Sequence, residues 1–267
     1  MKNVILRRWL TVLTTVLATT FVSCEKDVDE TKEDTPGQIA GLGETAGEPT
    51  GTSFKLPEGI ELADKIMGGY RASNYRSATA FDKQAAMNSL SRQRTWTIQT
   101  RAGDETIQLD TILGSGYFVE IFMPLRNSTS RVVTVTFPAG LIAESVSGRC
   151  QNGVLLKKAT VQIPVGRIYG VLLKMYCGNA HRDPSYSSEE YVFTVVSNSS
   201  LIMDLCNRVK NKRINNEEYP LGSDGHAKSS QYDSYVSKLQ SILWNLTDYG
   251  AALSESSIAE IEAMENS

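Results

Sequence analysis

Apolar and polar residues alternate along much of residues 95–197, which is the period of a β-strand that buries one face. Val133, Val135 and Phe137, for example, share one side of such a stretch. Gly, Pro and Asn residues separate the stretches, as turns require. We expect strands at 95–100, 105–109, 117–123, 132–137, 154–156, 159–163, 168–177 and 191–196. This spacing predicts a β-sandwich or barrel-like core of about seven to eight short strands.

Apolar residues recur at three- and four-residue intervals after Asn198, which is the period of a helix. We expect helices at about 201–212 and 229–249, and a third that Ser254 caps. Each follows a serine, a residue type that favours the first position of a helix. The sequence therefore predicts a helical portion at the C-terminal end.

One globular domain is expected from residue 54 to residue 267. Its strands occupy about 95–197 and its helices about 199–266, and no second break in composition divides it. Strands followed by helices predict the α+β class. Within the ambiguous stretch 54–95 we expect one short helix, around 80–92.

Residues 1–23 have the features of a lipoprotein signal peptide. Basic residues precede a mostly apolar run from Trp9 to Val22, which is short for a membrane span. The run ends in Phe21-Val22-Ser23-Cys24, which resembles the lipobox of bacterial lipoproteins. The resemblance implies that Cys24 carries acyl chains such as palmitate, which bind membranes with about 0.8 kcal/mol per buried methylene. The alternative is a plain signal peptide with an incidental cysteine.

Residues 24–53 are acidic at first and then rich in Gly, Thr and Pro. With no aromatic residue between 25 and 53, the segment has little apolar surface to bury and is predicted to be a disordered tether. Its acidic start, Glu25 to Glu30, resembles the surface-export signal of Bacteroidota lipoproteins, which implies an outer-membrane protein exposed on the cell surface. The alternatives are a charge run that only solvates the tether, and a periplasmic orientation.

The chain is mildly acidic. Its formal net charge is −3, and loss of residues 1–23 removes three positive charges and leaves −6. Such a domain is not built to collect phosphate backbones, so we exclude nucleic acid as a partner. The expected partners are the membrane, through the lipid on Cys24, and an unidentified host-surface, glycan or peptide ligand.

Cys150, Cys177 and Cys206 follow Cys24 in the chain. An odd number in an exported protein leaves at least one outside an intrachain disulfide. Cys206 lies in an expected helix and is interpreted as a small buried hydrophobe. Cys177 ends the stretch 168–177 on its apolar face, so we expect a rigid, half-buried thiol at the rim of the core.

Gln240 flanks the apolar face of the helix expected at 229–249. A glutamine at this position can direct its amide toward the sheet on which the helix packs. Trp244 follows one turn later and can cover that amide from water. The helix therefore offers the strand-end thiol of Cys177 a partner.

Tyr176-Cys177 and Leu239-Gln240-Ser241-Ile242-Leu243-Trp244 resemble the two motifs of the thioester domains of bacterial surface adhesins. The resemblance implies that the Cys177 thiol attacks the Gln240 side-chain amide, expels ammonia and leaves an internal thioester. It also implies that Tyr176 and Trp244 shield this bond, and that a nucleophile on a target surface, such as an amine, takes the acyl group. Ile242 stands where the motif has a small residue, and Gly178 stands where an apolar residue often follows the cysteine.

Other interpretations stay open. One is an ordinary core cysteine beside a helix-edge glutamine, in an accessory lipoprotein that binds a glycan or peptide without covalent chemistry. We expect no metal site, because His181 and His226 are the only histidines and no close cysteine pair accompanies them. We expect no cofactor, and no hydrolase residues, since isolated loop acids such as Asp183 form no recognisable catalytic pair.

Overall fold

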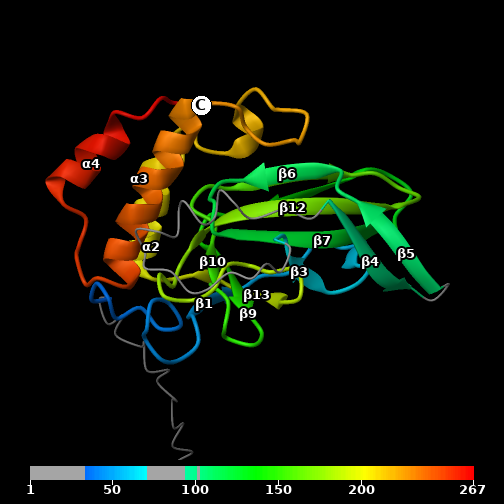
Figure 1. Cartoon of the computed structure of the whole chain (residues 1–267), viewed down its shortest axis with the longest axis horizontal. Coiled ribbons are helices and arrows are strands. Elements are labelled where there is room, and N and C mark those ends of the chain that lie inside the picture. The colour runs from blue at the N-terminus through cyan, green and yellow to red at the C-terminus, as the bar shows by residue number, and fades with distance from the viewer. Residues whose placement is uncertain (1–33, 71–93, 101–102) are drawn as a thin grey trace, which may run out of the picture. The chain divides into compact units, whose positions relative to one another are not determined.

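The computed structural model describes residues 34–70, 94–100 and 103–267 (Figure 1). The signal peptide, Cys24 and the helix expected around 80–92 lie outside the described residues. Strands make up most of the domain, and the three α-helices of the described part lie in the C-terminal region. The α+β class predicted from the sequence is confirmed.

Six antiparallel strands close into a barrel. The ladder from β12 back to β7 completes the ring, so no edge of these strands is left open along their paired length. The strands, in ring order, are β7 (Val119–Asn127), β3 (Ile66–Gly68), β13 (Glu190–Ser197), β9 (Leu141–Ser145), β10 (Gly153–Val154) and β12 (Ile168–Cys177).

Further strands extend the barrel. β1 (Gly51–Ser53) pairs with β13, β2 (Ile60–Leu62) pairs with β7, and β6 (Thr111–Gly114) runs parallel to β12. Two further antiparallel pairs form separate two-stranded sheets: β4 (Thr95–Thr100) forms a hairpin with β5 (Gly103–Gln108), and β8 (Val133–Phe137) pairs with β11 (Ala159–Ile163). The sequence predicted no strand before residue 95; β1, β2 and β3 each span three residues, too few to show an alternating pattern.

β12 is the central strand, and only Tyr169 among its residues is not buried. Its inward side chains, such as Leu173 and Met175, belong to the apolar core of the barrel. Its outward side chains meet the β4–β5 hairpin at one end, where Trp96 stacks on Phe122 of β7 at 3.8 Å, and the helices at the other. Because both faces of the strand are buried, its sequence is apolar at nearly every position and does not alternate.

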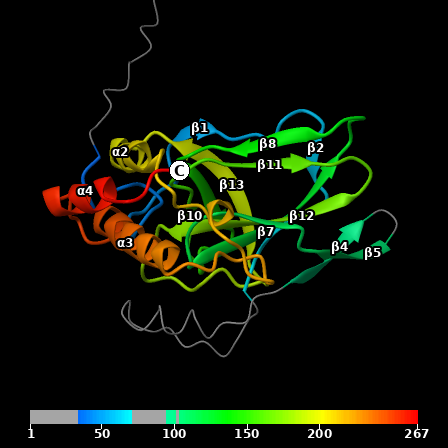
Figure 2. The same cartoon turned by 90° about the horizontal axis from the view of Figure 1, so that it is seen from above.

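The helices are α2 (Ser200–Val209), α3 (Ser230–Thr247) and α4 (Glu255–Glu262), with a short 3-10 turn, η1 (Asn216–Glu218), between α2 and α3. Ser199, Ser229 and Ser254 cap the three α-helices, because each hydroxyl accepts a backbone N–H of the first turn. Figures 1 and 2 show the helices gathered at one end of the barrel and the β4–β5 hairpin at the other.

Residues 34–53 correct the predicted tether. Leu42 is fully buried and Ile39 nearly so, both against the helices, and residues 51–53 form β1. The prediction of disorder from composition was wrong for these residues. Their few apolar side chains pack against apolar surface that distant parts of the fold supply. The domain therefore begins earlier than residue 54. We call residues 36–47 the strap.

Candidate functional site

The Gln240 side chain lies directly against the backbone of Cys177. The Cys177 N–H donates to Gln240 Oε1 at 2.9 Å, and Gln240 Nε2 donates to the Cys177 carbonyl at 2.9 Å. Cys177 is 0 % exposed and Gln240 is 2 % exposed. The structure thus brings together the two residues singled out in the sequence.

The end of a strand ladder makes room for this contact. The pairing of β7 with β12 stops at Val119 and Met175, two residues before Cys177, while β10 continues along the other edge and pairs Gly153 with Cys177. The Gln240 amide, which here donates once and accepts once, takes the place that a residue opposite Cys177 would occupy if the β7 ladder continued. α3 packs across this end of β12 and so supplies the side chain.

Asn179 holds the Cys177 sulfur. The thiol donates to the Asn179 carbonyl at 3.2 Å, and the Asn179 N–H donates to Sγ at 3.4 Å. The Asn179 amide is itself fixed, because Oδ1 accepts the Asn152 N–H at 2.9 Å and Nδ2 donates to the Gly43 carbonyl at 2.7 Å. The thiol was expected to be half-buried at the rim; it is instead fully buried, because it lies within the apolar core cluster of the barrel.

Trp244 and Tyr176 lie on different sides of β12. Trp244 is buried in the barrel core cluster that also contains Cys177, and its ring lies 5.1 Å from that of Phe118. Tyr176 is buried on the outward face, in the cluster that contains the helices, and accepts the Ser115 hydroxyl at 2.5 Å. Of the two expected shields, Trp244 lies in the cluster of the thiol, whereas Tyr176 lies in the cluster on the helix side.

The strap covers the turn that follows Cys177. Leu42 packs on Gly178, where an added Cβ would lie 2.7 Å from Leu42 Cδ2. This contact gives a physical reason for a glycine at position 178, because a larger residue would displace Leu42. The strap was not predicted from the sequence; the available signal was Ile39 and Leu42 within a glycine-rich stretch.

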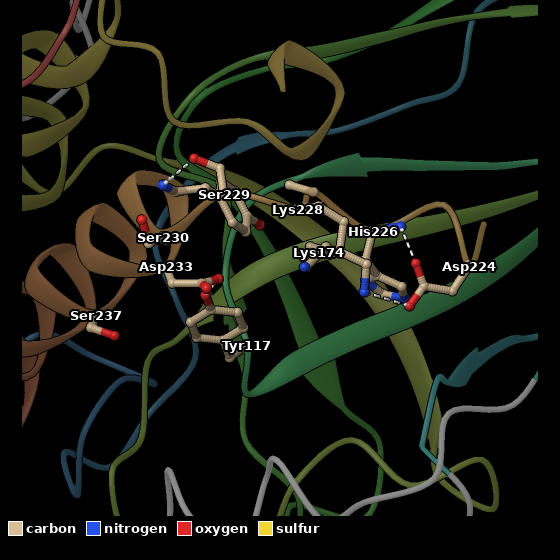
Figure 3. Close-up of a pocket in the computed structure, with 11 residues that line it drawn as sticks. Tyr117, Lys174, Asp224, His226, Lys228, Ser229, Ser230, Asp233 and Ser237 are labelled. Atoms are coloured by element: carbon tan, nitrogen blue, oxygen red, sulfur yellow. Dashed lines mark hydrogen bonds and ion pairs between the residues drawn. The ribbon is translucent and has the colours of Figure 1, made fainter. Parts of the chain in front are cut away.

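A separate cavity of about 580 Å³ opens at the N-terminal end of α3 (Figure 3). Lys174 lines it, 1 % exposed, with its ammonium over the rings of Tyr117 and Tyr232 and 3.9 Å from the Glu120 carboxylate. Tyr117 also donates its hydroxyl to Asp233. Figure 3 shows further polar groups around the opening, namely Asp224, His226, Lys228, Ser229, Ser230 and Ser237. The cavity therefore offers both hydrogen-bond donors and acceptors to a small polar ligand.

No disulfide joins Cys150, Cys177 or Cys206 within the described residues. The described part of the chain holds no group of three or more His, Cys, Asp or Glu side chains that suits a metal ion. No helix among residues 34–70, 94–100 and 103–267 is long and apolar enough to cross a membrane.

Comparison of the chain with protein-family models, with curated proteins and with solved structures found no match.

Proposed function

We propose that this chain is a lipid-anchored adhesion protein of the bacterial cell surface, and that Cys177 and Gln240 form an internal thioester through which it attaches to its target. The observation that carries the proposal is the pair of hydrogen bonds between the Gln240 amide and the Cys177 backbone in a fully buried environment. The contact fixes the amide beside the backbone of the residue whose thiol would attack it, and an intramolecular reaction is favoured when its two groups are held close together.

Thioester formation balances without a further reactant. Sγ of Cys177 attacks Cδ of Gln240, the C–N bond breaks, and the thiol proton leaves with the amide nitrogen as ammonia. Negative charge develops on Oε1 in the tetrahedral intermediate, and Oε1 already accepts the Cys177 N–H. A fixed backbone donor on the oxygen that gains charge favours this step.

The thioester would then react with an amine on a target surface. The amine attacks the carbonyl carbon, an amide bond to the Gln240 acyl group forms, and the Cys177 thiol is released. Hydrolysis is the competing reaction, so the bond must be kept from water until the target arrives. The burial of Cys177, Gln240 and Trp244 supports this requirement.

Anchoring and location rest on the first residues of the sequence. Phe21-Val22-Ser23-Cys24 supports lipidation of Cys24, and the acidic run from Glu25 supports export to the outer face of the outer membrane. A covalent adhesin needs a firm attachment to its own cell, and acyl chains on Cys24 would supply it.

Intact-mass analysis of the purified protein under nonreducing conditions tests the thioester. We expect a mass below that of the unmodified chain by one ammonia, and methylamine should then raise it by one methylamine. Cys177→Ala should abolish the deficit. Cys206→Ala should retain it, because the Cys206 thiol lies against the carbonyl of Leu155 rather than near Gln240. A native mass without the deficit contradicts the covalent mechanism.

The cavity beside α3 favours a second candidate function, noncovalent binding of a glycan or peptide. The observation that favours it is a cavity of about 580 Å³ lined by Lys174, Asp233 and serine hydroxyls. Under this alternative, binding of an oligosaccharide or short peptide would weaken on Asp233→Ala and be unchanged by Cys177→Ala. Titration calorimetry with a panel of such ligands distinguishes the two functions.

A further inference from the structure

The strap joins the two elements that carry the candidate thioester. On the strand side, the Gly43 N–H donates to the Gly178 carbonyl at 2.6 Å, and the Asn152 side chain donates to the Gly41 carbonyl at 3.0 Å. On the helix side, the Gly37 N–H donates to the carbonyl of Leu246 in α3 at 2.7 Å. The strap therefore spans the seam between the end of β12 and α3.

A short chain of contacts links the strap to the thiol. The Gly43 carbonyl accepts the Asn179 side chain at 2.7 Å, and Asn179 in turn contacts Sγ of Cys177 through its own backbone N–H and carbonyl. Asn179 is 0 % exposed under this cover. Removal of the strap would leave the Asn179 amide without its Gly43 partner and would uncover the turn that holds the sulfur.

The strap is also separable from the rest of the fold. It belongs to none of the ladders of the barrel, and its buried apolar anchors among the described residues are Ile39 and Leu42. Segments of this kind open locally at a lower free energy than the core. In the sequence the strap follows soon after Cys24, so a pull on the anchored end would reach it before it reaches β1.

We propose that the strap is a removable seal, and that its displacement opens the Cys177–Gln240 site to nucleophiles. This inference rests on the proposed function for its purpose, since a covalent adhesin benefits from a bond that stays closed until the protein is engaged. Its structural content is separate: displacement of the strap raises the reactivity of the site, measured at the Gln240 acyl group if the thioester has formed and at the Cys177 thiol if it has not.

Two glycine variants of the purified protein test the seal. At Gly43 an added Cβ would lie 2.0 Å from the Thr247 carbonyl oxygen, so Gly43→Ala forces the strap off α3. Gly47→Ala is the matched control, because Gly47 has a positive φ as Gly43 does, yet its added Cβ meets nothing closer than Ala40 at 3.7 Å. Leu42→Ala, which removes the buried anchor, is the second test variant.

The readout depends on the mass of the native protein. If the ammonia deficit is present, the rate of methylamine uptake at Gln240 is measured; if it is absent, the rate of iodoacetamide alkylation of Cys177 is measured. We expect Gly43→Ala and Leu42→Ala to raise that rate about tenfold or more, as local opening becomes more frequent, and Gly47→Ala to leave it nearly unchanged. Cys206, alkylated in the same sample, reports global unfolding and should not change.

The results separate the two proposals. An absent ammonia deficit overturns the thioester alone, because the Cys177 alkylation rate still reports the seal. Unchanged rates in folded Gly43→Ala and Leu42→Ala overturn the seal alone. A parallel rise at Cys177 and Cys206, or failure of both variants to fold, shows that the strap is an integral part of the fold and also overturns the seal.

Discussion

Gln240 is a polar side chain that is almost completely buried, and its two hydrogen bonds to Cys177 account for this. A buried amide is tolerated when its donor and acceptor both find partners. Here the partners are backbone groups at a strand end that the ladder with β7 no longer reaches. The same contact serves the fold and the proposed chemistry, so variants of Gln240 report on both.

Gln240→Leu should lower the free energy of unfolding. The substitution leaves the buried N–H and carbonyl of Cys177 without the Gln240 amide, and each lost partner costs about 1–3 kcal/mol. Gln231→Leu is the control, since Gln231 is exposed on the same helix. Urea denaturation measures both; equal effects at the two positions would mean that the Gln240 contact does not stabilise the fold.

Cys150 and Cys206 should resist alkylation in the folded protein. Burial raises the pKa of Cys150 to about 11 and the pKa of Cys206 to about 12, so that at pH 8 the reactive thiolate is scarce at both positions. Iodoacetamide should label both rapidly in urea and only slowly in buffer. Equal rates in the two conditions would place these thiols at the surface.

Among the helices and strands, the sequence predicted correctly those whose bounds follow from a local pattern of residues. The strands 159–163 and 168–177 have the predicted bounds, and the predicted serine cap of the last helix is confirmed. Pattern failed where an element is very short or is held by distant residues. β10 has two residues, and closure of the barrel through it is a property of pairing, which no local alternation encodes.

Ser229→Ala should destabilise α3, the helix that presents Gln240. The Ser229 hydroxyl accepts the Tyr232 N–H at 3.3 Å, and loss of such a cap costs about 0.5–2 kcal/mol. Ser230→Ala is the control, because Ser230 is the exposed next residue and has no capping role. Thermal denaturation checks the difference, and a larger loss with Ser230→Ala would contradict the assigned cap.

At the scale of the whole molecule, the site depends on segments far apart in the chain. The strap, the turn after β12 and α3 meet around one thiol, although the first lies before residue 50 and the last after residue 229. The sequence placed the thiol and the amide on elements that were expected to pack together. It did not reveal the strap, because a glycine-rich stretch with two apolar residues is typical of a linker.

Cys24→Ala should release the protein from the membrane. Under the proposed function the acyl chains on this cysteine are the anchor, and alanine offers no thiol to carry them. Fractionation of cells followed by a carbonate wash measures the effect. Retention of the variant in the washed membranes would contradict anchoring through Cys24.

The proposed attachment requires a covalent bond between Cys177 and Gln240, and tandem mass spectrometry of methylamine-treated protein detects that bond at the level of single residues. We expect a methylamide at Gln240 and at no other glutamine, together with a Cys177 thiol that appears only after the treatment. An unmodified Gln240, with Cys177 already present as a thiol in the untreated and denatured protein, would contradict it.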